Sequence, residues 1–203
     1  MKKNKISKNW INKQRRDLYV RKSKIEGYRS RAVYKFKEID EKFKILNNVS
    51  NVIDLGAAPG SWSQYLSQKI KNGKIVSIDL LKFESIRNTT QIIGDFTNND
   101  VQLMIKSHFK KKIDLVISDM AVNTTGNKNL DSIVTGELCL EAMRFSIDFL
   151  NRNGRFISKI FMGSTFNEIV AYAKKAFKDV RIFKPLASRK DSKENFLICK
   201  KLR

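Results

Sequence analysis

The strongest constraint on the fold is a regular alternation of short apolar runs and helical stretches that begins at about residue 49. Such alternation is typical of a doubly wound α/β sheet with a mainly parallel core. The connection between the last two runs contains Pro185 and is too short for a helical crossover, so we expect those strands to pair antiparallel at one edge. The expected strands are residues 51–55, 74–78, 90–93, 113–117, 155–160, 180–183 and 196–199, and the expected helices lie near 61–70, 99–109, 131–150 and 165–177.

Charge is the outlier of the composition. The 203 residues fit one domain, and the hydrophobic share of 41% is ordinary for a globular protein. Lys and Arg number 41 against 20 Asp and Glu, a formal net charge of +21. A field of this sign attracts polyanions, which makes nucleic acid the leading candidate partner. An AT-rich genome that favours Lys codons is the alternative origin of part of the excess, but it does not remove the charge.

The first 31 residues are the most biased part of the chain, with Lys and Arg interrupted by Trp10, Tyr19 and Tyr28. We interpret residues 1–28 as a basic N-terminal arm, and two roles remain open for it, a solvated charged face or an RNA contact. From Ser30 onward, apolar residues recur at helical spacing, which predicts a basic amphipathic helix.

Other classes of protein are disfavoured. No apolar run is long enough for a membrane span, and the basic start lacks the apolar stretch of a secretory signal. Cys139 and Cys199 have no second Cys or His at metal-ligand spacing, so we predict no metal site and a reducing cytoplasm. His108, the single histidine, lies near a helix end and is interpreted as structural.

The first expected strand ends in Asp54-Leu55-Gly56-Ala57-Ala58-Pro59-Gly60. Ligands of doubly wound sheets bind at the carboxyl ends of the strands, where this string lies. Gly56 and Gly60 permit a tight turn and close approach of the backbone to a ligand. The string is not GxGxxG, which disfavours a dinucleotide.

Carboxylates follow the next strands. Asp79 lies about 20 residues beyond the glycine loop, where an acid can accept hydrogen bonds from both ribose hydroxyls of a nucleoside. Asp95 and Phe96 follow the third strand and could hold an exocyclic amine and stack on a base, and a turn with a core Phe remains the alternative.

Charged residues also mark the later strands. Asp119 ends the fourth strand, where cofactor and substrate would meet. Lys159 lies among apolar neighbours of the fifth strand, and a buried lysine needs a partner. Glu194, at the start of the last strand, can be that partner, and Lys35 can lean over the sheet edge from the preceding helix.

Together these motifs resemble the FtsJ/RrmJ family of RNA ribose 2′-O-methyltransferases, and within it the bacterial enzymes that modify a uridine of large-subunit rRNA. The likeness runs from about Tyr28 to the C-terminus. It implies an α/β fold with a single Rossmann-like class I methyltransferase domain over residues 29–203, a mainly parallel seven-stranded sheet with an antiparallel edge strand, and helices on both faces. The likeness is carried by Ser30-Arg31-Ala32-x-x-Lys35, the glycine loop, Gly94-Asp95-Phe96, Ser118-Asp119-Met120-Ala121, Ser158-Lys159, and Ser188-Arg189 ahead of Glu194.

The resemblance also implies roles. It makes S-adenosyl-L-methionine the methyl donor and Lys159 the principal catalytic residue, a base or an electrostatic stabiliser of the forming alkoxide. Lys35 and Glu194 would orient Lys159 and the ribose, and Asp119 would hold both the cofactor and Lys159. The family's cofactor contacts fall on Gly60, Trp62, Asp79, Asp95 and Asp119, and the loop arguments above add Gly56 and Phe96.

The chain departs from the family at two positions. Ser61 stands where the family usually has a second Gly, and Val122 where it has a Pro. Ser61 is small and is expected to cap the next helix without harming cofactor binding. Val122 would loosen a loop near the substrate.

Several alternatives remain. Methylation of cytosine C5 needs a loop cysteine, and methylation of base amines typically needs a Pro-Pro-aromatic loop after the fourth strand, neither of which the sequence offers. A non-catalytic RNA-binding or ribosome-assembly protein, or a methyltransferase of tRNA or of an mRNA cap, stays open. The favoured partner is ribosomal RNA or the large ribosomal subunit, bound by a monomer.

Overall fold

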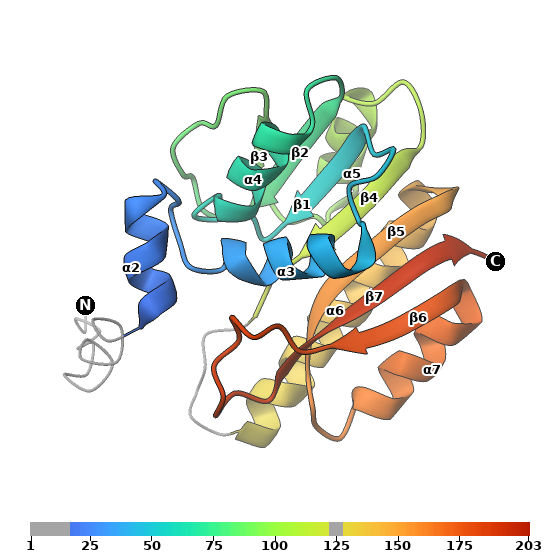
Figure 1. The fold of residues 1–203 in the computed structure, drawn as a ribbon. Helices are drawn as coiled ribbons and strands as arrows, with labels where there is room; N and C mark the ends of the chain where they lie inside the picture. The colour runs from blue at the N-terminus through green and yellow to red at the C-terminus, as the bar shows by residue number, and fades with distance from the viewer. Residues whose placement is uncertain (1–16, 122–127) are drawn as a thin grey trace, which may run out of the picture.

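The computed structural model describes residues 17–121 and 128–203 as a central sheet with helices on both faces (Figure 1). Within these ranges, seven strands lie in the order β3-β2-β1-β4-β5-β7-β6. The strands are β1 Asn51–Leu55, β2 Lys74–Asp79, β3 Thr90–Ile93, β4 Ile113–Ser118, β5 Leu150–Phe161, β6 Phe177–Phe183 and β7 Glu194–Leu202. The helices are α2 Leu18–Ile25, α3 Val33–Phe43, α4 Ser61–Lys69, α5 Asn99–Ser107, α6 Lys128–Phe149 and α7 Phe166–Ala176.

The sheet is mainly parallel, as the sequence predicts. Strands β1 to β5 pair in parallel, and β7 pairs antiparallel with both β5 and β6. The expected antiparallel pairing of the last two strands is therefore confirmed. The two strands lie at one edge of the sheet, with β6 outermost and β7 beside it, as the sequence predicts. Because β7 lies between two strands, it is buried along most of its length, whereas the edge strand β6 is largely exposed or half-buried.

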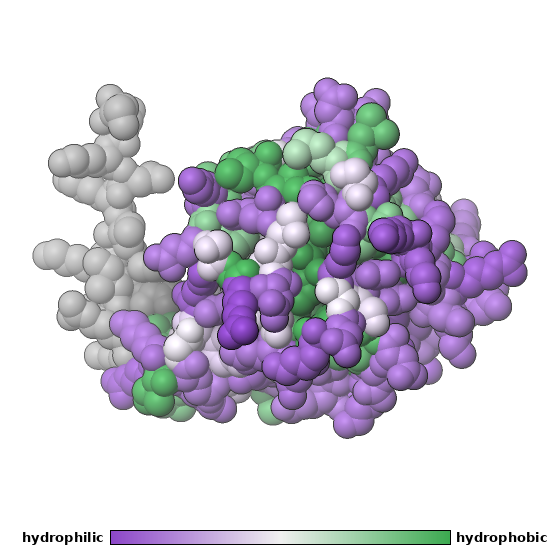
Figure 2. Space-filling view, turned by 90° about the horizontal axis from the view of Figure 1, so that it is seen from above, coloured by the Kyte–Doolittle hydropathy of each residue, from purple (hydrophilic) through white to green (hydrophobic). Residues whose placement is uncertain are grey.

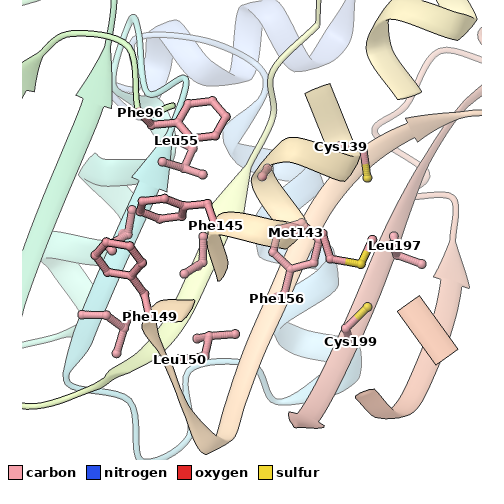
Figure 3. Packing of buried hydrophobic residues seen from close by; sticks show 14 of the residues in the cluster. Leu55, Phe96, Cys139, Met143, Phe145, Phe149, Leu150, Phe156, Leu197 and Cys199 are labelled. Atoms are coloured by element: carbon pink, nitrogen blue, oxygen red, sulfur yellow. The ribbon is translucent and has the colours of Figure 1, made fainter. Parts of the chain in front are cut away.

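Two hydrophobic layers enclose the sheet. Helices α5, α6 and α7 pack on one face, and α3 and α4 pack on the other. On the first face, Phe145 and Phe149 of α6 stack with ring centroids 4.2 Å apart, and Phe96 meets Phe145 edge-on (Figure 3). The helices thus cover both faces of the sheet, and the ends of its strands remain available for a binding site.

Helix α2 was not predicted, because it lies within the basic arm, whose composition was interpreted as that of a charged segment. It begins at Asp17, whose carboxylate accepts a hydrogen bond from the Tyr19 N–H as an N-cap. Asp17 also pairs with Arg31, and the Tyr19 ring lies 5.3 Å from that of Tyr34 in α3. The described part of the arm is therefore packed on the domain, whereas Trp10 lies outside the described residues.

The hydrophilic character of the surface is consistent with the high net charge of the chain. Viewed from above, hydrophilic side chains cover most of this face, and hydrophobic ones form small, separate areas (Figure 2). None of the helices in the two described ranges is long and apolar enough to cross a membrane.

Candidate active site

Four charged side chains meet at the carboxyl end of the sheet. Lys35 comes from α3, Asp119 follows β4, Lys159 lies in β5 and Glu194 begins β7. The Lys35 Nζ lies 2.8 Å from Glu194 Oε2 and 3.5 Å from Asp119 Oδ2. The Lys159 Nζ lies 2.7 Å from Asp119 Oδ1 and 3.7 Å from Glu194 Oε2. The structure therefore brings the four predicted catalytic residues into one cluster.

This cluster is shielded from water. Its four side chains are between 9 and 16% exposed. Burial by itself lowers the pKa of Lys35, but Asp119 and Glu194 outweigh it and hold that pKa above its usual value. Burial likewise favours the neutral form of Asp119, yet the ammonium groups of Lys159 and Lys35 keep its pKa below the usual range. Asp119 and Lys35 therefore stay charged in the folded protein.

The alternation of side chains along β5 directs Lys159 toward the cluster. Successive side chains of β5 point to opposite faces, so Phe156 and Ile160 join the layer under α6, while Ile157 and Lys159 face α3. The Lys159 ammonium also donates a hydrogen bond of 2.8 Å to the backbone oxygen of Asp119. This bond ties the end of β5 to the end of β4.

The glycine loop lies directly beside the cluster. Gly56 adopts a φ of 68°, and the N–H groups of Gly56 and Ala57 donate to the Ile78 oxygen of β2. A Cβ atom on Gly56 would lie 2.1 Å from the Cγ of Met120, the residue after Asp119. Only glycine therefore fits at this turn, as the motif predicts.

Two predicted cofactor carboxylates lie at the ends of the neighbouring strands. Asp79 accepts hydrogen bonds of 2.8 Å from the Ala58 and Leu81 N–H groups, which connects the end of β2 to the glycine loop. Asp95 is exposed, and its Oδ1 accepts from the N–H and hydroxyl of Thr97. Each carboxylate keeps lone pairs for a further donor.

Two residues that were predicted to contact the cofactor have side chains buried in the core. Trp62 is 3% exposed, its indole N–H donates to the Ala32 oxygen, and its ring stacks on Phe36. Phe96 is buried against Phe145. The side chains of Trp62 and Phe96 thus belong to the core, since each is taken up by aromatic packing. Trp62 can offer its backbone N–H in the first turn of α4, and Phe96 supports the loop that carries Asp95.

The prediction that Ser61 caps α4 is wrong. Gly60 is the N-cap residue, with a φ of 102°, and Ser61 is the first helical residue. The Ser61 hydroxyl is buried and lies 2.8 Å from that of Ser30, just before α3. The departure from the family's Gly therefore joins the glycine loop to the segment that carries Lys35. The second departure, Val122, lies outside the described residues.

Two residues of the motifs named above make contacts that no pattern predicted. The buried Ser188 hydroxyl donates to Glu194 Oε1 at 2.7 Å and leaves Oε2 for the lysines. Asp54 is buried beneath the glycine loop, where it accepts from the Ser63 hydroxyl. Burial, reinforced by the charges of Asp119 and Asp79, raises the pKa of Asp54 to about 7 despite that bond. Membership of the Ser188-Arg189 motif was the only available signal for Ser188.

Solved structures define the class. A ribosomal RNA methyltransferase from Plasmodium falciparum matches with a TM-score of 0.78 and 34% identity, covering 86% of this chain and 98% of the other. A Streptococcus mutans methyltransferase in complex with SAH matches with a TM-score of 0.52 and 15% identity, covering 81% and 97%, and shows the fold alone. With the site above, these matches define the fold of a class I methyltransferase.

The sequence comparisons define the family. The sequence model of the FtsJ-like methyltransferases matches residues 28–202. The chain is 64% identical, over the full length of both proteins, to ribosomal RNA large subunit methyltransferase E of Pelagibacter ubique. It is 46% identical to the protein of that name from Rickettsia bellii, covering 95% of this chain and 87% of the relative. The chain therefore belongs to the FtsJ-like methyltransferase family.

Proposed function

We propose that this protein transfers a methyl group from S-adenosyl-L-methionine to a ribose 2′-hydroxyl of large-subunit ribosomal RNA, at a uridine. The observation that carries the proposal is the buried cluster of Lys35, Asp119, Lys159 and Glu194 beside the glycine loop. The names of the Pelagibacter and Rickettsia relatives support the choice of large-subunit RNA.

The residues at the strand ends fit the proposed cofactor. A nucleoside presents ribose hydroxyls and an amine, which need acceptors, and Asp79 and Asp95 offer carboxylate oxygens there. The sulfonium and amino groups of the methionine end are cationic, and Asp119 supplies a nearby negative charge. Gly56 and Gly60 let the backbone approach closely.

The bound cofactor supplies an electrophilic methyl group, so the protein's task is to align the hydroxyl and manage its proton. As an ammonium, Lys159 stabilises the forming alkoxide; alternatively, after it has released its own proton, its Nζ receives that of the 2′-hydroxyl. Asp119 holds Lys159 through its carboxylate and its backbone oxygen. Lys35 contacts the same two carboxylates and orients the ribose. Burial of the cluster excludes water from the reacting atoms.

The basic arm of residues 1–28, which precedes the methyltransferase domain of residues 29–203, is proposed to contact the RNA backbone. The net charge of +21 supports a phosphate-rich partner.

We further propose that the protein acts as a monomer in the cytoplasm. The buried Cys139 and Cys199 are both free thiols, in agreement with a reducing compartment. Light scattering of the purified protein measures its molar mass in solution and so tests the proposed monomeric state.

The decisive experiment supplies the purified protein with radiolabelled S-adenosyl-L-methionine and separate pools of large subunits, small subunits, naked rRNA, tRNA and capped RNA. We expect label in large-subunit RNA at one position that resists alkaline cleavage, and no label with Lys159→Ala. The exposed Lys175 of α7 provides the matched control, since Lys175→Ala should keep full activity. Label in tRNA or capped RNA would overturn the substrate, and cofactor binding without label in any pool would favour the non-catalytic alternative.

A further inference from the structure

The Arg29 side chain joins two loops that are far apart in the sequence. Its Nη1 donates hydrogen bonds to the Pro59 oxygen at 3.1 Å and to the Glu84 oxygen at 2.6 Å. Its Nη2 donates to the Ser85 oxygen at 3.0 Å. Pro59 belongs to the glycine loop, and Glu84 and Ser85 belong to the loop of residues 80–89 that follows β2. One guanidinium therefore connects the two loops.

Arg29 is itself held in place. Its backbone N–H donates to Gln64 Oε1 of α4 at 2.9 Å. Its guanidinium carbon lies 5.8 Å from the ring centroid of Phe83. The side chain is 18% exposed although it carries a full charge. The ion pair with Glu84 adds little, because that carboxylate is 93% exposed and lies 3.6 Å away. The backbone carbonyl contacts are thus the main connection.

The connected loop lies against the glycine turn. A Cβ atom on Gly60 would lie 2.7 Å from Ile86 Cδ1, 2.9 Å from Arg29 Nη1 and 3.0 Å from Phe83 Cε2. Residues 80–89 contain no helix or strand, so their position depends on side-chain attachments. The same loop starts directly after Asp79, whose carboxylate binds the Ala58 N–H. A shift of this loop would therefore disturb both the Leu81 hydrogen bond to the Asp79 carboxylate and the packing beside Gly60.

We propose that Arg29 is a positioning residue for the cofactor site, which it shapes by fixing loop 80–89 against the glycine loop. The inference rests on the proposed use of S-adenosyl-L-methionine but not on the identity of the RNA. A planar fork with several N–H groups can reach carbonyls on both loops, whereas a lysine ammonium cannot span them. Loss of Arg29 weakens cofactor binding and leaves the catalytic cluster intact.

The test compares Arg29→Lys and Arg29→Gln with wild type. We expect the dissociation constant for S-adenosyl-L-methionine, measured by calorimetry without RNA, to rise at least 10-fold in both variants. With large subunits as substrate, the KM for the cofactor should rise similarly, while kcat at saturation and the KM for subunits stay within about twofold of wild type, since Arg29 does not touch the reacting atoms. Amide hydrogen exchange in residues 80–89 should become faster.

The matched control is Arg87→Ala, which removes a positive charge from the exposed side of the same loop and should change none of these values. Thermal unfolding identifies any variant that fails to fold, and Arg29→Lys keeps the charge and most of the side-chain volume. Unchanged cofactor affinity in both Arg29 variants overturns the proposal. So does a raised KM for subunits alone, which would make Arg29 an RNA contact. Failure of wild type to methylate any RNA would overturn the proposed function and leave the calorimetric test standing.

Discussion

Lys35 and Lys159 share a single carboxylate oxygen, Glu194 Oε2, at 2.8 and 3.7 Å. Two ammonium groups buried so close together repel each other, and the negative charges of Glu194 and Asp119 compensate for that repulsion. The other oxygen of Glu194 accepts the Ser188 hydroxyl, which fixes the carboxylate plane. The charge balance of the cluster is therefore part of both its chemistry and its stability.

Glu194→Gln should destabilise the protein and lower its activity. The amide keeps the shape of Glu194 but leaves both lysines with only Asp119, and breaking a buried ion pair costs on the order of 3 kcal/mol. Denaturant unfolding measures the loss, and single-turnover assays should show a methyl-transfer rate reduced by roughly 100-fold or more. Glu168→Gln, at an exposed position of α7, is the control. Equal stability of the two variants would contradict the proposed charge balance.

Asp54 should make stability depend on pH. Its pKa is raised to about 7 in the folded protein, mainly by burial, so the folded state holds a proton that the unfolded state has already released. The contribution of this group is fully present below the usual pKa of a free aspartate, near 4, and is lost as the pH rises toward 7.

Asp54→Asn removes this titration. The unfolding free energy of the variant relative to wild type should therefore increase between pH 5 and pH 7, by at most about 1.4 kcal/mol per pH unit, and level off above pH 8. Denaturant unfolding of the cofactor-free protein at pH 5, 6, 7 and 8 measures the difference. Parallel profiles for the two proteins would show that Asp54 ionises normally.

Gly56→Ala should impair cofactor binding through two separable effects. The new methyl group collides with Met120 Cγ, and a φ of 68° costs a residue with a side chain about 1–2 kcal/mol. The double variant Gly56→Ala/Met120→Ala relieves the collision and should recover part of the lost calorimetric affinity.

Gly27→Ala isolates the backbone effect. Gly27 has a similar φ of 73°, and no atom lies within 4 Å of the place that a methyl group on this residue would take. This variant should lose stability without losing cofactor affinity. If Gly56→Ala behaves like Gly27→Ala in both assays, the close contact with Met120 has no role.

Trp62→Phe should affect stability and not cofactor affinity. The substitution removes the bond to the Ala32 oxygen and part of the stacking on Phe36, at a cost of about 1–3 kcal/mol. Thermal unfolding and calorimetric titration with S-adenosyl-L-methionine separate the two effects. A 10-fold weaker affinity at unchanged stability would restore the side-chain contact implied by the family resemblance.

The sequence predicted those features that a local pattern or a motif encodes. Strand alternation located the sheet, and the motifs around Lys35 and Lys159 located the cluster that we propose as catalytic. The direction of Trp62 was not predictable in this way, because it depends on how α3 packs against α4. The role of Arg29 depends on contacts with residues 30 to 56 positions away, about which no local pattern carries information.

The position of β7 also determines which residues can take part in the chemistry. Because β7 runs opposite to β5, it begins where β5 finishes, and Glu194 lies opposite Phe161. A parallel strand in the same place would start at the other end of the sheet, roughly 20 Å away at about 3.3 Å per residue. The reversal therefore lets a residue near the C-terminus complete the proposed reaction centre, to which helix α3 contributes Lys35. Truncation of the chain before β7 would remove Glu194 together with a buried strand that joins β5 to β6.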